Sequence, residues 1–329
     1  MAKKTLTYLV VDTETATLPM CSELAYDAES KKKLAIAKPL VYDIGWNITN
    51  RKGEILEHKQ FLIAETFCVP QIFNTAYYAE KRPIYMKMLA NGETIIKTWD
   101  EVMNLFIQDM QSVDAVGAYN SMFDFKKAIP FTELYIRNLY SNHYMEWEKI
   151  QKESCRRILN DSKPPRNPDF DADNFCFRGE NYPLFDLWGL ATKILLNNVS
   201  YKKNCLDHDL LSASGLYFKT SAETTYQYIC DKYDFVESHT ALDDATIETF
   251  ILSKIASRHA INIGISFFPF RELGETVDFV QRLKRPNIEE CEKVIAAIEL
   301  HLESKEEGTA YYSKMEKKID IIMDYMGRE

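Results

Sequence analysis

The chain has 329 residues, of which 46% are hydrophobic and 27% are charged, so it is long enough to bury a sizeable core without cross-links. Its formal net charge of −9 argues against a protein that coats nucleic acid through bulk positive charge, although a local basic groove is compatible with an acidic body. Binding of a polyanion would therefore have to be local or assisted by metal ions.

The seven cysteines are scattered and none forms a C-x-x-C pair, which predicts reduced thiols, no disulfide framework and no zinc ribbon. Cys205 and His208 have a ligand-like spacing, but two ligands do not make a zinc site. The apolar run after Lys3 and Lys4 ends at Asp12 and is too short for a signal peptide or a membrane span. These features predict a soluble, cytoplasmic protein that does not bind a membrane.

The N-terminal part alternates strand-like and helix-like patterns. Residues 5–12 are β-branched and apolar, which predicts a buried strand. Residues 40–48 and 55–63 are also strand-like and flank a turn signal, which predicts a hairpin. The pattern from Trp99 is helical, and residues 114–118 are typical of a short buried strand. Strands that alternate with helices predict an α/β sheet.

Further elements are expected downstream. A helix should start near Met122 and bend at Pro130. Residues 141–183 contain clustered prolines and polar residues, which predicts an inserted loop or lid. A long helix is expected over residues 240–257. We therefore expect residues 1–260 to form one domain.

The remaining residues, 261–329, are predicted to form a C-terminal helical extension. A helix that starts behind Asn287 as N-cap has one apolar face, formed by Ile288, Cys291, Ile295, Ile298 and Leu302. A second helix repeats this spacing at Tyr312, Met315, Ile319, Ile322 and Met326. The second face fits either packing onto the same chain or docking of a protein partner.

Two carboxylates follow the first predicted strand. Because side chains alternate along a strand, Asp12 and Glu14 should point to one face at its C-terminal end, where α/β sheets usually bind ligands. Two like charges repel at this position unless a cation compensates them. A lone D-x-E is common by chance, and an exposed strand end is the alternative interpretation.

Three further groups occur at the ends of elements. Asp124 starts the helix that follows the short strand, where it could also act as a helix cap. His239 precedes the long helix, and Asp244 lies on the apolar face of that helix, where a carboxylate needs a partner. Helical geometry alone does not choose between Asp244 and its neighbour Asp243.

These residues resemble the motifs of the DEDDh family of 3′–5′ exonucleases, which has the ribonuclease H-like fold and includes the proofreading subunit of bacterial DNA polymerase III. The family motifs D-x-E, N-x-x-F-D and H-x-x-x-x-D-A match residues 12–14, 120–124 and 239–245 in the same order. The spacing of the third motif selects Asp244 over Asp243. The resemblance covers nearly all of the first domain and none of the C-terminal extension.

The resemblance implies a ribonuclease H-like mixed β-sheet flanked by helices on both faces. It also implies a metal-dependent enzyme that hydrolyses phosphodiester bonds at the 3′ ends of single-stranded DNA and releases nucleoside 5′-monophosphates. Proofreading or DNA repair would fit this activity. We find no second catalytic motif, so proofreading would need a polymerase on another chain, which the C-terminal helices could bind.

The resemblance further implies a role for each of five residues. Asp12 would bridge two Mg²⁺ or Mn²⁺ ions. Glu14 and Asp244 would complete the site of one ion, and Asp124 would hold the other. His239 would be the general base, because imidazole has an unperturbed pKa of about 6.5 and accepts a proton near neutral pH. The alternative for His239 is a helix cap.

Four residues are implied to contact the substrate. Thr15 and Leu18 correspond to positions that receive the terminal nucleotide in the family. Asn120 would support the turn of the second motif. Phe123 would pack either on a base or on the core, and the sequence does not choose between these positions.

Two departures from the family pattern concern substrate preference more than chemistry. The family often has D-T-E-T-T-G-L where this chain has Ala16 and Thr17, and the segment between the second and third motifs is longer than a compact member needs. Positive charge interleaved with aromatic rings suits single strands. The candidate phosphate contacts are Lys126, Lys127, Lys81 and Arg82 beside Tyr77 and Tyr78, and Tyr201 with Lys202 and Lys203.

Two alternative functions remain open. An RNA 3′–5′ exonuclease would use the same five residues and differ in its ribose contacts. A polymerase-associated or accessory nucleic-acid-binding subunit would keep the fold without catalysis. The intact set of four acids and a histidine argues against this loss, because a pure scaffold has no need to keep like charges clustered.

Overall fold

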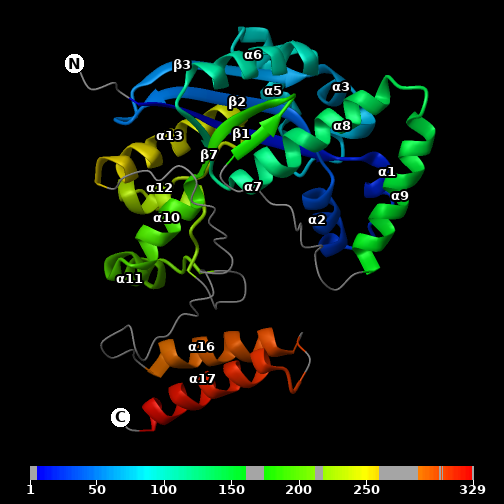
Figure 1. The fold of residues 1–329 in the computed structure, drawn as a ribbon. Helices are drawn as coiled ribbons and strands as arrows, with labels where there is room; N and C mark the ends of the chain where they lie inside the picture. Colours follow the sequence, from blue (N-terminus) through cyan, green and yellow to red (C-terminus); the bar gives the residue numbers. More distant parts are fainter. Residues whose placement is uncertain are drawn as a thin grey trace. The chain divides into compact units, whose positions relative to one another are not determined.

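The computed structural model describes residues 6–160, 174–211, 218–258, 288–303, 305 and 307–327 (Figure 1). The chain divides into two compact units. Unit 1 comprises Met1–Trp188 and Val236–Phe267, and unit 2 comprises Gly189–Phe235 and Phe268–Glu329. The predicted domain boundary near residue 260 falls outside the described residues, and part of the segment before it belongs to unit 2.

The described residues of unit 1 form one seven-stranded mixed sheet with the strand order β4-β3-β2-β1-β5-β7-β6. The strands are β1 (Thr7–Thr17), β2 (Pro39–Asn50), β3 (Ile55–Ile63), β4 (Ile95–Lys97), β5 (Ala115–Ala118), β6 (Asn174–Phe177) and β7 (Glu180–Asp186). β1 is central, because it pairs antiparallel with β2 on one side and parallel with β5 on the other. The predicted α/β class, the first strand, the hairpin and the short strand at 114–118 are confirmed.

Helices cover the sheet and link its strands. In unit 1 they are α1 (Pro19–Ser22), α2 (Ala28–Ala37), α3 (Ala64–Phe67), α4 (Pro70–Phe73), η1 (Ala79–Lys81), α5 (Arg82–Asn91), α6 (Trp99–Ser112), α7 (Ser121–Phe123), η2 (Asp124–Ala128), α8 (Ile129–Leu139), α9 (Tyr144–Asn160) and α13 (Ala241–Arg258). α10 (Leu187–Leu196) follows β7 directly, and the helices wholly in unit 2 are α11 (Val199–Asp207), α12 (Ala222–Cys230), α16 (Ile288–Leu302) and α17 (Ala310–Met326). The helices expected from Trp99 and over 240–257 are confirmed.

Two successive residues of β2 show that helices lie on both faces of the sheet. The ring of Trp46 packs 5.1 Å from that of Phe106 in α6. The side-chain amide of the next residue, Asn47, donates to the hydroxyl of Thr249 in α13 at 3.3 Å. Because adjacent side chains of a strand point to opposite faces, α6 and α13 cover opposite faces, as Figure 1 also shows.

The helix expected from Met122 is interrupted before Pro130. The short helix α7 leads into η2, which is a π-helical turn, and α8 then begins with Pro130 in its first turn. Proline is tolerated there because the first N–H groups of a helix have no partner within it. π-helical turns are frequent at functional sites, and this one begins at Asp124.

The prediction of an inserted loop over 141–183 is wrong for most of that segment. Residues 144–160 form α9, and β6 and β7 complete the edge of the sheet. α9 is rich in charged residues, but it buries Trp147, Gln151 and Cys155, which are one turn apart along one face. The proline cluster itself lies within residues 161–173, outside the described residues.

The prediction that no cysteines form disulfides is also wrong. Cys21 of α1 and Cys155 of α9 are joined, with their Cα atoms 5.8 Å apart. The two are 134 positions apart in the sequence, so only the packing of α1 against α9 brings them together. No spacing rule for cysteines could have identified this pair.

In unit 2, the two C-terminal helices pack against each other. Their buried side chains include Cys291, Val294, Ile298 and Leu302 of α16, and Met315 and Ile322 of α17. Much of the predicted apolar faces is therefore covered within the chain, whereas Ile288 is half exposed. Docking of a partner remains a prediction. Among the described residues, none of the helices has the length and apolar character of a membrane span.

Candidate active site

Asp12 and Glu14 lie in the second half of β1. The parallel pairing of β1 with β5 covers only residues 8–10, so the two carboxylates lie beyond it. Across the antiparallel pairing with β2, Asp12 is opposite Gly45 and Glu14 is opposite Asp43. Cross-strand partners share a face of the sheet, and this is the face that α13 covers.

β2 holds the first turn of α13 close to these carboxylates. Gly45 permits the close approach, since a Cβ atom at this position would overlap the backbone of Leu242. One carboxylate oxygen of Asp43 accepts a hydrogen bond from the backbone N–H of Ala241 at 3.0 Å. The first turn of α13 also carries Asp244, so β2 fixes the distance between Asp244 and β1.

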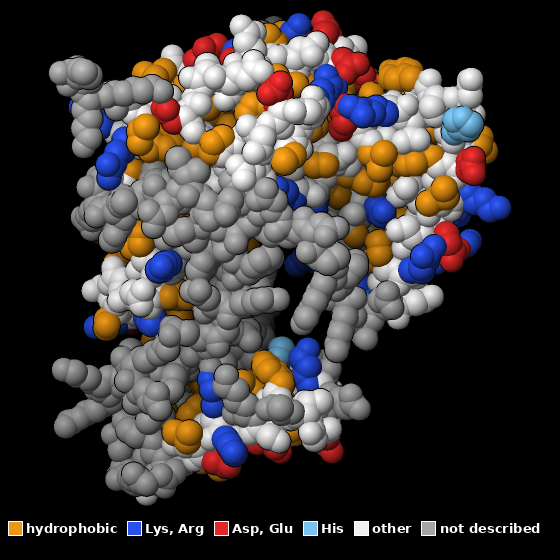
Figure 2. All heavy atoms as spheres, in the orientation of Figure 1, with side chains coloured by type: hydrophobic (Ala, Val, Ile, Leu, Met, Phe, Trp, Pro, Cys, Tyr) orange, Lys and Arg blue, Asp and Glu red, His pale blue; other side chains and the backbone are white. Residues whose placement is uncertain are grey.

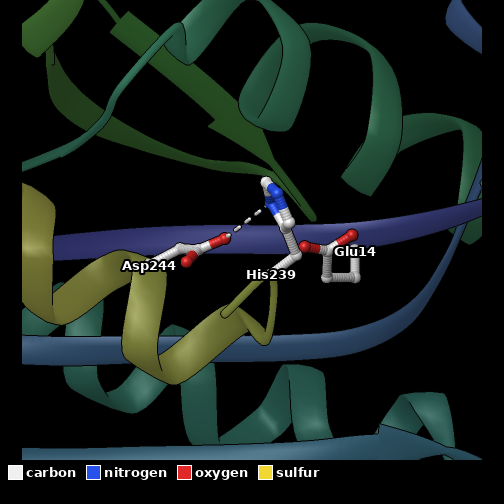
Figure 3. Close-up of side chains that lie close together, drawn as sticks. All are labelled: Glu14, His239 and Asp244. Atoms are coloured by element: carbon white, nitrogen blue, oxygen red, sulfur yellow. Dashed lines mark ion pairs between the residues drawn. The ribbon is translucent and has the colours of Figure 1, made fainter. Parts of the chain in front are cut away.

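Glu14, His239 and Asp244 gather at this point, as Figure 3 shows. One potential ligand atom of each residue lies within 4.8 Å of the others. His239 Nδ1 is 3.7 Å from Asp244 Oδ2. His239 lies just before α13 and has a backbone φ of 53°, in the left-handed region that non-glycine residues rarely adopt. His239 therefore has an unusual backbone conformation, and its imidazole lies beside two carboxylates.

Asp243 and Asp244 differ in exposure and in the direction of their side chains. Asp243 is exposed and accepts hydrogen bonds from the hydroxyls of Ser238 and Thr240 at 2.8 and 2.9 Å. Asp244 is 8% exposed and faces the site. Asp243 thus ties the turn before α13 together, and Asp244 is the aspartate that lies with Glu14 and His239.

Asp124 follows β5, which pairs with β1 along the edge opposite to β2. Asp124 is 4% exposed, and its carboxylate accepts a hydrogen bond from the hydroxyl of Thr13 at 2.6 Å. Asn120 has a φ of 83°, and its carbonyl accepts from the N–H of Phe123 at 2.7 Å. This tight turn at the end of β5 directs the chain back so that Asp124 reaches β1.

The acidic groups raise one another's pKa values. Burial raises the pKa of Asp12 well above its usual value, and the charges of Glu248, Asp124, Asp244 and Glu14 raise it further. Burial and then Asp244 raise the pKa of Glu14 in the same way. The pKa of Asp124 is raised to about 7, chiefly by burial. Such raised pKa values are typical of sites built to bind cations or to transfer protons.

Glu248 is an acidic member of the site that the sequence did not predict. It is 3% exposed, and its carboxylate accepts from the backbone N–H of Tyr119 at 3.1 Å. Burial and the charge of Asp124 raise its pKa well above the usual value. Glu248 lies one helical turn after Asp244, and this spacing is the signal that could have identified it.

The oxygen atoms of the site fit divalent cations. Asp244 Oδ1 is buried and has no hydrogen-bond partner among the described residues. A buried carboxylate oxygen without a partner costs free energy unless a cation or donor reaches it. Carboxylates are the preferred ligands of Mg²⁺ and Mn²⁺. Asp12, Glu14, Asp124 and Asp244 could therefore hold these ions.

The four residues implied to contact substrate differ in exposure. Thr15 and Asn120 are partly exposed beside the acids. Phe123 is partly buried and packs against the core, while still keeping some exposure. Leu18 is fully buried in the core cluster, so its side chain has no accessible surface in this structure.

The candidate phosphate contacts also differ. Lys81 lies at the site, where its charge acts on Glu14 and its Nζ contacts the carbonyl of Ser238. The guanidinium of Arg82 packs 5.1 Å from the ring centre of Phe73. Tyr201 is fully buried in unit 2, so its ring cannot stack on a nucleic acid base. Figure 2 shows basic and acidic side chains interspersed on the displayed face of unit 1.

Tyr78 contacts His239 directly, a relation that the sequence did not predict. Its hydroxyl is 3.0 Å from His239 Nε2, and the two rings stack with centres 4.2 Å apart. The segment that carries Tyr78 lies between β3 and α5, far from His239 in sequence. Only the fold brings the two rings together.

No protein-family model, curated protein or solved structure matches the chain. Any functional assignment must therefore be argued from the motifs and from the geometry of this site.

Proposed function

We propose that the protein is a metal-dependent 3′–5′ exonuclease that removes nucleoside 5′-monophosphates from single-stranded DNA ends. The observation that carries this proposal is the convergence of Glu14, His239 and Asp244, whose potential ligand atoms lie within 4.8 Å of one another. Asp12 and Asp124 act electrostatically on the same cluster. A mixed sheet with helices on both faces supports a ribonuclease H-like fold.

Phosphodiester hydrolysis suits such a cluster because the attacking hydroxide, the phosphate and the leaving oxygen are all negatively charged. Two divalent cations, when bound, would neutralise this charge and favour both attack and departure. Asp12, Glu14, Asp124 and Asp244 would hold the ions. Thr13 orients Asp124 through the hydrogen bond to its carboxylate.

His239 would act as general base and take the proton of the attacking water. Its ring is held beside Asp244 and is partly exposed, so that a water molecule can reach it. Thr15 and Asn120 would contact the terminal nucleotide, and Lys81 would contact its phosphate. Since each assigned residue is at or beside the acid cluster, the chemistry needs only this chain and two ions.

A digestion series tests the proposal. The wild-type protein and an Asp12→Asn variant are incubated with 5′-labelled single-stranded DNA, duplex DNA and RNA of one sequence, in Mg²⁺, Mn²⁺ or chelator. We expect a metal-dependent ladder that shortens from the 3′ end of single-stranded DNA, and no ladder with the variant.

The other outcomes are informative. Faster digestion of RNA would assign the activity to RNA ends, because the same acids serve both polymers. Failure of the wild type to cleave any substrate in either metal would contradict the proposal and favour an accessory, non-catalytic subunit.

A further inference from the structure

The imidazole of His239 is held from two sides. Its Nδ1 faces carboxylates, 3.7 Å from Asp244 Oδ2 and 3.9 Å from Glu237 Oε2. Its Nε2 is 3.0 Å from the hydroxyl of Tyr78. The two rings are nearly parallel, with an interplanar angle of 15°. Nδ1 is therefore the nitrogen that faces the acid cluster, and Nε2 is the nitrogen that faces Tyr78.

The segment that carries Tyr78 is also anchored to the turn before His239. Lys81 Nζ lies 4.4 Å from the ring centre of Tyr78 and donates to the carbonyl of Ser238. The hydroxyl of Tyr85 contacts the carbonyl of His239 at 3.5 Å. These contacts keep the ring of Tyr78 over the imidazole of His239, a residue whose backbone φ is in the left-handed region.

The two possible tautomers of a neutral imidazole have different consequences here. If Nε2 carries the hydrogen, it donates to the oxygen of Tyr78 and leaves the lone pair of Nδ1 facing the acid cluster. If Nδ1 carries the hydrogen, Tyr78 donates to Nε2, so the single acceptor lone pair of the ring is occupied and none faces a water molecule at the cluster. Only the first tautomer can accept a proton on the side of the acids.

We propose that Tyr78 is a positioning residue that accepts the Nε2–H of His239 and so keeps Nδ1 unprotonated and directed into the site. This inference rests on the proposed function, in which His239 takes a proton from water. After the transfer, the new Nδ1–H faces Asp244 and Glu237, whose negative charges stabilise the imidazolium. Residues beyond the direct ligands commonly fix histidine tautomers in this way.

Removal of the Tyr78 hydroxyl tests this role while the stacked ring is kept. In Tyr78→Phe, Nε2–H loses its acceptor, so the Nδ1–H form that faces Asp244 and Glu237 gains population. We expect kcat to fall about 10–100-fold with KM changed less than threefold, in keeping with the loss of an orienting partner. This loss is smaller than the roughly 10²–10⁴-fold expected on removal of the base itself. Tyr26→Phe removes an exposed hydroxyl and should leave kcat unchanged.

The tautomer can be measured without any activity. Nitrogen NMR of the metal-free protein labelled at histidine, with His239 assigned from a His239→Asn variant, distinguishes a protonated Nε2 from a protonated Nδ1. We expect protonated Nε2 in the wild type and a shift toward protonated Nδ1 in Tyr78→Phe. A wild type with protonated Nδ1, or an active Tyr78→Phe enzyme with an unchanged kcat, would overturn the role of Tyr78. Absence of cleavage by the wild type would instead overturn the proposed function.

Discussion

At the scale of single residues, the surroundings of Asp12 disfavour its ionised form. Burial and the charges of Glu248 and Asp124 raise its pKa, so its ionised form costs folding free energy near neutral pH. We expect Asp12→Asn to raise the Tm of the metal-free protein by a few degrees, since 1 kcal/mol corresponds to about 2–4 °C for a domain of this size. Calorimetry in the presence of chelator measures this shift, and a lowered Tm would show that the ionised cluster does not destabilise the fold.

The same residues predict a pH dependence. The pKa values of Asp124 and Asp43 are raised to about 7 and about 6 from an unfolded value of 3.8. A carboxyl whose pKa rises on folding stabilises the fold when protonated, so this contribution is complete below about pH 4 and is lost as the pH rises through 6 and 7.

We therefore expect the Tm of the metal-free protein to increase as the pH is lowered from 8 to 5.5. Saturating Mg²⁺ should reduce this slope, because bound ions stabilise the ionised carboxylates. Thermal scans at four pH values, with Mg²⁺ or chelator, measure both slopes. A Tm of the metal-free protein that falls over this interval would contradict the assigned burial of the acids.

The sequence motifs predicted Asp12, Glu14, Asp124, His239 and Asp244 as one candidate site, because these residues occupy fixed positions in short motifs. The motifs missed Glu248, although that residue lies one helical turn after Asp244 in α13. They also missed the role of Asp43 and the contact of Tyr78 with His239, which depend on tertiary contacts. Tyr78 and His239, for example, are 161 positions apart. Residues that support a site from a distant segment leave no local pattern in a single sequence.

At the scale of elements, the packing of α13 on β2 sets the site. An added Cβ at Gly45 would overlap backbone atoms of Leu242 and Ala241, which cannot move without shifting α13. We expect Gly45→Ala to cost about 1–3 kcal/mol of stability and to reduce cleavage at least tenfold, because it displaces Asp244 from Glu14. Denaturant unfolding and the digestion assay measure the two effects.

Gly92→Ala is the matched comparison. Gly92 has a φ of 74° but open space around it, so alanine there should cost only about 1 kcal/mol of backbone strain and leave cleavage intact. Equal activity of the two variants would show that α13 does not need to lie this close to β2.

Elements with a regular apolar pattern were predicted correctly, as for β1, the hairpin of β2 and β3, and α6. α9 was missed because it is rich in charged residues, and its buried face consists of a few side chains including Gln151. β7 was missed because the prolines before it suggested a loop. In both cases the tertiary contacts of the element, and not its local composition, decide its conformation.

At the scale of the whole molecule, the disulfide between Cys21 and Cys155 ties the segment after β1 to α9. A cross-link over 134 positions restricts the unfolded chain, and its loss typically costs about 2–5 kcal/mol. We expect a reductant to lower the Tm of the wild type, and a Cys155→Ser variant to start from the lower Tm and not respond. A wild type that is insensitive to reductant would contradict a stabilising cross-link.

The class of the fold followed from the alternation of strands and helices, whereas the division into two units did not. Residues 189–235 group with residues 268–329, across a stretch of sequence that carries His239 and α13. The chain passes from unit 1 to unit 2 after Trp188 and returns at Val236. No sequence signal was recognised at either position, so residues 1–260 were predicted to form one domain.

We propose that Asp244, held against Glu14 and His239, is a ligand of a catalytic metal ion. The most direct test compares Asp244→Asn with Asp243→Asn in the Mg²⁺-dependent digestion of 5′-labelled single-stranded DNA, since the two substitutions are chemically identical and adjacent. We predict that Asp244→Asn lowers the rate at least 10²-fold and that Asp243→Asn stays within a few-fold of the wild type. Equal losses in the two variants, or full activity of Asp244→Asn, would contradict this assignment of the site.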